Sequence, residues 1–98
     1  MPRRILNRIR MAVRNSTYDM TVHAIEEMAE DFLDIADLEV AILKGRLIKT
    51  EKDDPRGTRY TLQGIAMNGI TLVGTAGRFT ETGRYLIITV YEVAEPEL

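Results

Sequence analysis

The chain lacks cysteine and contains a single histidine, His23, among its 98 residues. Without cysteine it can form no disulfide, no thiolate zinc site and no cysteine nucleophile. A single histidine excludes a metal site built from several histidines, which leaves only a carboxylate-rich site conceivable. No apolar run approaches the roughly 18 residues that span a bilayer. We therefore expect a cytoplasmic protein with no membrane segment, no metal and no cofactor.

The length and composition are those of one small globular domain, residues 1–98. A hydrophobic content of 45% and a charged content of 29% are ordinary for such a protein and supply one modest core. The arginine-rich segment 1–15 contains no acid, as a transit peptide might, but it lacks the apolar region and cleavage site of a secretory signal. We interpret it as a structural helix.

Charge is segregated along the chain, although the formal net charge is only −2. Residues 1–18 carry five arginines and no acid, residues 19–43 carry eight acids and no lysine or arginine, and residues 44–59 carry six bases and three acids. A nucleic-acid-binding protein needs a coherent basic patch, which the two basic segments would have to build together. Alternatively, the basic first helix lies against the acidic second helix.

Apolar residues at helical spacing predict three helices, over residues 3–14, 22–32 and 35–44. Thr21 is the expected N-cap of the second helix, and Asp34 with Asp37 forms a variant capping box on the third. Gly45 is expected to end the third helix with a positive φ. The inward face of the second helix is expected to consist of Val22, Ile25, Met28 or Ala29, and Phe32.

After the helices the hydrophobic period changes to two, which predicts four strands, over residues 46–51, 58–66, 70–79 and 84–93. Asn68-Gly69 predicts a hairpin with a type I′ turn. In the last strand, Tyr91 is expected to share a face with Ile87 and Thr89, opposite the core. The predicted fold is α+β, with N-terminal helices packed on one face of a four-stranded antiparallel meander sheet.

Four sequence features, taken in order, resemble one family of small bacterial proteins. They are Tyr18-x-x-Thr21-x-His23-Ala24, "IADLEVAILKGRLI", "DDPRG" and "IITVYE". The family is filed as a domain of unknown function, is often encoded beside MqsA-type zinc-finger antitoxins, and is usually grouped with RelE/ParE-like toxins. The resemblance covers residues 5–92. Where members carry an arginine after the "HAxE" motif, this chain has Glu27.

The resemblance implies a RelE-like fold and a toxin-like role in a toxin–antitoxin module. It implies an antitoxin protein as partner, wrapped over the sheet, and RNA or the ribosome as target. RelE-like toxins cleave RNA without a metal, so a metal-independent endoribonuclease is one implied activity. ParE-like relatives inhibit gyrase instead, and fold alone does not choose between the two.

Metal-free RNA cleavage needs a base, an acid and cations for the developing charge. His23, Arg59 and Tyr91 are the candidate catalytic residues for these roles. Arg56, Arg78 and Tyr18 are the candidate substrate-binding residues, with arginine for phosphate and tyrosine for stacking on a base.

Five of the six candidates also have a plainer interpretation, which for Arg78 is solubility at the edge of the sheet. His23 would then fix the start of its helix, and Tyr91 would pack against the first helix. Arg56 would pair with Asp53 or Asp54, and Arg59 would be a solvated strand residue. If these interpretations hold, the chain is a non-catalytic protein-interaction module of the same fold, for example a homodimer through an exposed strand edge.

Overall fold

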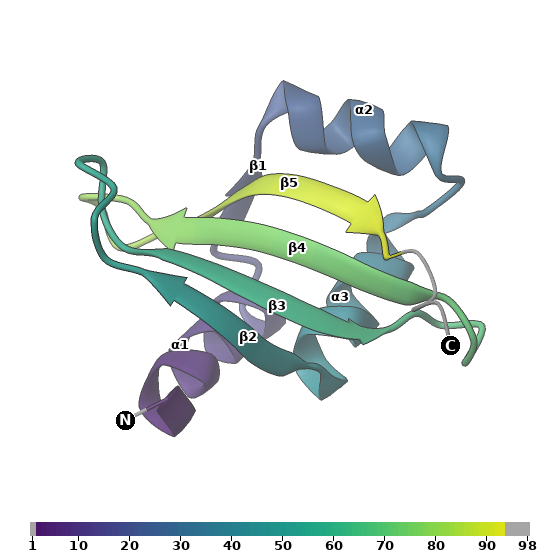
Figure 1. Cartoon of the computed structure of the whole chain (residues 1–98), viewed down its shortest axis with the longest axis horizontal. Helices are drawn as coiled ribbons and strands as arrows, with labels where there is room; N and C mark the ends of the chain where they lie inside the picture. The colour runs from purple at the N-terminus through teal and green to yellow at the C-terminus, as the bar shows by residue number, and fades with distance from the viewer. Residues whose placement is uncertain (1, 94–98) are drawn as a thin grey trace.

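A computed structural model describes residues 2–93, which form three helices and five strands (Figure 1). In chain order these are α1 (Pro2–Arg14), β1 (Tyr18–Met20), α2 (Val22–Glu30), α3 (Ile35–Lys44), β2 (Arg46–Glu51), β3 (Arg59–Ile65), β4 (Leu72–Phe79) and β5 (Tyr85–Glu92). The helices and β2 to β5 begin and end within two residues of their expected bounds. None of the helices within residues 2–93 has the length and apolar character of a membrane span.

The strands form one mixed sheet in the order β1-β5-β4-β3-β2. Strands β2 to β5 run antiparallel to their neighbours, whereas β1 is parallel to β5, with Tyr18 opposite Tyr85. The α+β class is confirmed, but the expected four-stranded antiparallel meander is wrong. A strand of three residues is too short to show alternation, and the partner of β1 is the last strand of the chain. The local sequence therefore does not predict β1.

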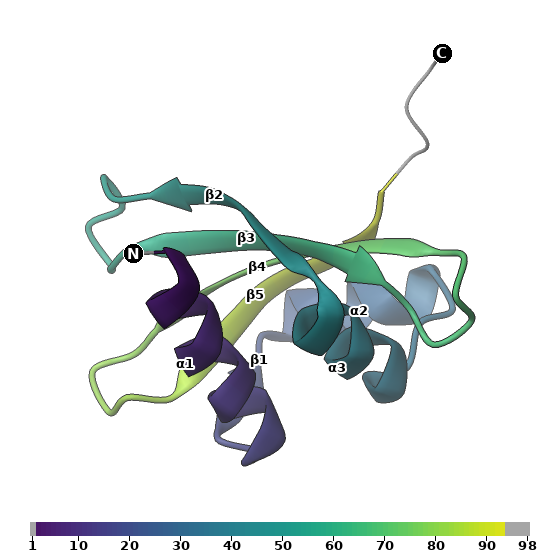
Figure 2. The same ribbon diagram turned by 90° about the horizontal axis from the view of Figure 1, so that it is seen from below.

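All three helices pack on one face of the sheet, as Figure 2 shows. Apolar side chains from the helices and from the facing side of the sheet form one core. Its largest fully buried members are Ile9, Leu38, Ile42, Leu62, Val73, Tyr85, Ile87 and Val90. Burial of a side chain of this size contributes about 1.5–3 kcal/mol, so this core is the main attachment between the two layers.

Helix α2 lies along the edge of β5 beyond the end of β1 (Figure 1). Thr21 caps the helix, as expected, and its hydroxyl also donates to a carbonyl of β5. Further along, the Val90 N–H donates to the Glu27 carboxylate. The Glu92 N–H donates to the Asp31 carboxylate. Side chains of α2 thus satisfy backbone groups that another strand would otherwise pair with, which protects this edge.

The expected inward face of α2 is confirmed for Met28 and wrong for Val22, Ile25 and Phe32. Ala24 and Met28 are the buried residues of this helix. By contrast, Val22 is 72% exposed, Ile25 is 54% exposed and the following Phe32 is 94% exposed. The hydrogen bonds to β5 determine this rotation, because they turn the acidic flank of α2 toward the sheet.

Two turns differ from their expected geometry. Gly45 has a φ of −86°, outside the left-handed region, and the glycine is explained by packing instead. A side chain there would collide with the carbonyl oxygens of Ala41 and Gln63. The hairpin at Asn68-Gly69 is not a type I′ turn, because Gly69 has a φ of +75° but Asn68 does not adopt a positive φ. The Asn68 side chain instead accepts two backbone N–H groups of a longer loop.

The basic helix α1 packs against α3 and approaches β2, rather than lying against α2. Its Arg10 donates to the carbonyl of Gly45, just before β2, at 2.9 Å. Across residues 4–93, no arginine of α1 forms an ion pair with an acid of α2. The two basic segments of the chain are therefore neighbours in space, and the alternative pairing of the basic and acidic helices is wrong.

Candidate functional site

No described helix covers the face of the sheet opposite the core (Figure 2). Directly opposed residues point to the same side of a sheet, and successive residues alternate. Leu62, Thr75 and Val90 form one opposed row on the buried side, so their neighbours along each strand point away from the helices. We call the outward residues the open face: Arg46, Lys49 and Glu51 of β2; Arg59, Thr61, Gln63 and Ile65 of β3; Leu72, Gly74, Ala76 and Arg78 of β4; and Leu86, Thr89 and Tyr91 of β5.

Tyr91 lies flat on this open face, over Gly74 of the neighbouring strand. The two residues are directly opposed, and a methyl group added to Gly74 would come within 2.5 Å of ring atoms Cε2 and Cζ of Tyr91. The glycine therefore provides the space in which the ring rests, and the ring is half-buried. Tyr91 and α1 are on opposite faces of the sheet, so Tyr91 does not pack against the first helix.

A β-bulge separates Tyr91 from one of its expected neighbours. The register of β4 and β5 shifts between Ala76 and Gly77, so that Ile87 opposes Gly77 while Thr89 opposes Ala76. Ile87 is consequently buried in the core, whereas Thr89 and Tyr91 remain on the open face. The predicted shared face of all three residues is wrong for Ile87.

The candidate cations gather at the other end of the open face. Arg59 Nε lies 4.0 Å from Glu51 Oε1, and Lys49 Nζ lies 3.8 Å from Glu51 Oε2. Arg59 is half-buried, and its Nε atom has no hydrogen-bond partner among the described residues. Arg78 opposes Leu86 of β5 and approaches the β2–β3 loop. With Arg46, strands β2 to β5 bring four bases and one acid to the open face, while Asp19 of β1 adds a second acid that pairs with Arg84, so the face attracts anions.

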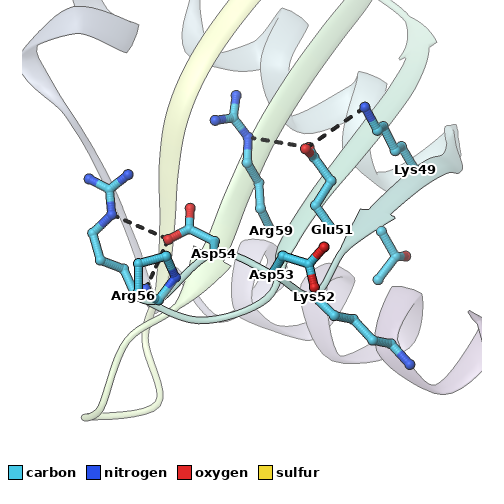
Figure 3. Close-up of a pocket in the computed structure, with 9 residues that line it drawn as sticks. Lys49, Glu51, Lys52, Asp53, Asp54, Arg56 and Arg59 are labelled. Carbon is cyan, nitrogen blue, oxygen red and sulfur yellow. Dashed lines mark hydrogen bonds and ion pairs between the residues drawn. The ribbon is translucent and has the colours of Figure 1, made fainter.

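Arg56 makes the ion pair that its plainer interpretation predicts (Figure 3). Its Nε atom lies 3.4 Å from Asp54 Oδ1, which also accepts the backbone N–H of Arg56 at 2.9 Å. That backbone hydrogen bond holds the pKa of Asp54 below its usual value, and the guanidinium groups of Arg56 and Arg78 lower it further. The surrounding loop lines an open hollow of about 750 Å³ with bases and acids intermixed. Arg56 is thus less available to a phosphate than Arg59 or Arg78.

His23 lies on the exposed side of α2, next to the edge of the open face. Its Nε2 atom is 3.3 Å from Glu27 Oε1. The same carboxylate oxygen accepts hydrogen bonds from the Thr89 hydroxyl and the Val90 N–H. Among residues 2–93, His23 connects to the open face through Glu27 and Thr89. Within residues 2–93, no three histidine or carboxylate side chains lie close enough together to hold a metal ion.

Tyr18 lies on the helix side of the sheet rather than on the open face. Its hydroxyl donates to Glu39 Oε2 of α3 at 2.7 Å. Burial, the hydrogen bond to Glu39 and the charge of that carboxylate all raise the pKa of Tyr18 above its ordinary value. The hydroxyl is thus occupied in joining β1 to α3, and the structure separates Tyr18 from the other candidate binding residues.

The three candidate catalytic residues do not meet at one point. Tyr91 opposes Gly74, and Arg78 lies four residues further along β4, which places the two ends of the open face roughly 13 Å apart. Arg59 is on the next strand at the Arg78 end, and His23 is beyond the edge of β5. The arrangement is an elongated surface with an aromatic ring at one end and cations at the other. Sequence reasoning missed the parts played by Gly74 and Thr89, which depend on pairing between strands.

A family model described as a domain of unknown function, DUF4258, matches residues 20–92. The match includes His23, Arg59 and Tyr91, and it leaves out α1 and Tyr18. No curated protein and no solved structure matches the chain. The expected resemblance to a domain of unknown function is confirmed, while the match itself makes no reference to toxins or antitoxins. Because it spans well over half of the 98 residues, the chain belongs to the DUF4258 family.

Proposed function

We propose that the chain binds single-stranded RNA on the open face. The observation that carries this proposal is the half-buried ring of Tyr91 seated on Gly74, on the same uncovered face as Arg59 and Arg78. Flat aromatic rings stack on unpaired bases, and cations along the same surface follow the phosphate backbone. Thr61, Gln63 and Thr89 add hydrogen-bonding side chains between the two ends. RNA or the ribosome as the target would also agree with the expected grouping of this family with RelE-like toxins.

In this proposal the chain acts as the toxin-like member of a cytoplasmic toxin–antitoxin module, through binding of RNA. Cleavage by His23, Arg59 and Tyr91 is less well supported than binding. A catalytic base and acid must each lie within about 3 Å of the atoms that exchange protons, and these three side chains are spread over three separate places. His23 is also next to a carboxylate that is already bonded to β5.

Binding of a fluorescent 12-nucleotide oligouridine, measured by anisotropy, tests the proposal. The double variant Arg59→Gln/Arg78→Gln should lose affinity at least about tenfold, and the slope of log Kd against log salt should fall by about 1.4 as two phosphate contacts disappear. Tyr91→Leu should weaken binding about tenfold or more, whereas Tyr91→Phe should retain most of it. Arg14→Gln, on the exposed side of α1, is the matched control. If Arg14→Gln weakens binding as much as the double variant, the open face is not the RNA site.

Growth after induced expression in a bacterium tests the toxin-like part. Wild-type protein should slow growth, and the Arg59→Gln/Arg78→Gln variant should not. A folded His23→Ala variant should remain inhibitory if binding suffices, but should lose inhibition if His23 takes part in cleavage. If wild type leaves both growth and bulk RNA unchanged, the toxin-like role fails, whatever the affinity for RNA.

The second candidate is a protein-interaction module. The exposed apolar stripe of α2 favours it, because soluble domains seldom leave neighbouring large apolar side chains in water without a use. This candidate needs no contact with RNA. The two candidates also use different sides of the molecule, so they can be tested separately.

A further inference from the structure

A second surface, on the helix side, consists of the outward stripe of α2 and the start of α3. Between these helices is an apolar groove of about 310 Å³, lined by Met20, Ile25, Met28, Ala29, Leu33 and Ile35. Ile25 is 54% exposed and Ile35 is 47% exposed. Val22, one turn before Ile25, is 72% exposed, and Phe32, just beyond the end of α2, is 94% exposed. We call these residues the docking surface.

Phe32 gives this surface its most unusual feature. Its φ of +55° lies in the left-handed region, and its side chain is 94% exposed. The Phe32 N–H donates to the Ala29 carbonyl, and the Leu33 N–H donates to the Met28 carbonyl. This is the Schellman ending of a helix, in which the left-handed position is usually glycine.

The fold itself gains little from a phenylalanine at that position. An L-residue is sterically strained in the left-handed region, and the exposed ring of Phe32 buries almost no area in return. The apolar contact that normally accompanies this ending is made by Leu33 and Met28, which line the groove together. Strain that nothing in the fold offsets is typical of residues used in binding.

The charge around the groove indicates what kind of partner fits it. Asp34 lines the groove at the start of α3, and Glu26 and Glu30 are exposed elsewhere on α2. The whole segment 19–43 contains eight acids and no lysine or arginine. An apolar groove within such an acidic segment complements a helix that has an apolar stripe flanked by lysine or arginine.

We propose that the docking surface binds a basic amphipathic helix of another protein, with the ring of Phe32 as an anchor. A second copy of this chain is disfavoured, because a symmetric pairing would bring two acidic segments together. The basic helix α1 cannot serve as the ligand either, since Ile9 and Val13 of its apolar stripe are buried in its own core. The docking surface is separate from the open face, so the proposal does not depend on RNA binding.

The test uses three synthetic 16-residue peptides and isothermal titration calorimetry. The first has leucines at helical i, i+3, i+4 and i+7 spacing with lysines on both flanks. The second has glutamates in place of the lysines, and the third has serines in place of the leucines. Wild-type protein should bind the first peptide at least about tenfold more tightly than either of the others, since both the groove and the acidic segment are then matched.

Two variants locate the binding. Phe32→Gly should weaken binding of the first peptide at least about tenfold, as the loss of an anchor residue does. Because glycine suits the left-handed position, the same variant should melt about 4 °C higher than wild type, so lost binding would not reflect unfolding. Ile25→Gln should also weaken binding. Met11→Gln is the control, since Met11 is a helical residue of similar exposure, 56%, on α1.

The remaining outcomes overturn the proposal. Equal binding of the first and third peptides would show that charge alone attracts the peptide. Equal affinity of wild type and Phe32→Gly for the first peptide would show that Phe32 is not an anchor residue. Sedimentation equilibrium measures whether the protein forms a dimer. A wild-type dimer that dissociates in Phe32→Gly would identify a second copy as the occupant, contrary to a basic partner.

Discussion

Glu27 is expected to be among the polar residues that contribute most to the stability of this fold. One carboxylate oxygen accepts hydrogen bonds from the Val90 N–H, at 3.0 Å, and from the Thr89 hydroxyl. Hydrogen bonds to a charged group contribute about 1.5–3 kcal/mol each, but the two share one oxygen and are partly accessible to water. We therefore expect Glu27→Ala to lower the free energy of unfolding by about 3 kcal/mol, leaving the Val90 N–H without its partner.

Urea unfolding followed by circular dichroism measures this loss. In a domain of this size, about 3 kcal/mol corresponds to a fall in melting temperature of roughly 12–24 °C. Glu27→Gln keeps an acceptor oxygen but loses the charge, and should fall between wild type and Glu27→Ala. Glu26→Ala, on the exposed side of the same helix, should change stability by less than about 0.5 kcal/mol. If Glu27→Ala also stays within that limit, the side chains of α2 do not secure the edge of β5.

Three further predictions follow from individual contacts. Gly74→Val should displace the ring of Tyr91 and reduce affinity for oligouridine as much as Tyr91→Leu does, in the same anisotropy assay. Gly45→Ala should destabilise the protein by more than about 2 kcal/mol in urea, because the added methyl group collides with backbone carbonyls of α3 and β3. The hydrogen bond from Arg84 lowers the pKa of Asp19 in the folded state, so its stabilising contribution is present above the unfolded pKa and disappears as pH falls through the folded pKa. Asp19→Asn should therefore flatten the dependence of melting temperature on pH below about pH 4, measured by differential scanning calorimetry.

The parts of the fold that were predictable are those with local causes. The start of α3 follows from Asp34 and Asp37, whose reciprocal hydrogen bonds form within the helix terminus itself. Strand β1 has no such cause, because three residues with β1 geometry form a strand only when β5 is already beside them. The rotation of α2 has the same origin. Its apolar stripe predicts an inward face, but hydrogen bonds from β5 to Glu27 and Asp31 outweigh that preference.

In the candidate site, too, the features with local causes were predictable and those that depend on strand pairing were not. Alternation in the last strand was enough to place Thr89 and Tyr91 away from the core, as the structure has them. Alternation could not predict the bulge that turns Ile87 inward, nor the glycine that seats the Tyr91 ring, since both depend on register with β4. Glu27 drew attention in the sequence only as a departure from a family pattern. In the structure it is the link between a helix and a strand edge.

Helix α2 explains why this domain offers two surfaces rather than one. One flank buries Met28 in the core, a second holds the edge of β5 through Glu27, and the third exposes Ile25. A helix that satisfied its apolar stripe against the sheet could not also present its acids to the strand edge. The hydrogen bonds that protect β5 therefore leave the apolar stripe of α2 exposed as part of the docking surface. A protein partner on the helix side and an RNA strand on the open face would occupy different sides of the sheet, so each can bind without displacing the other.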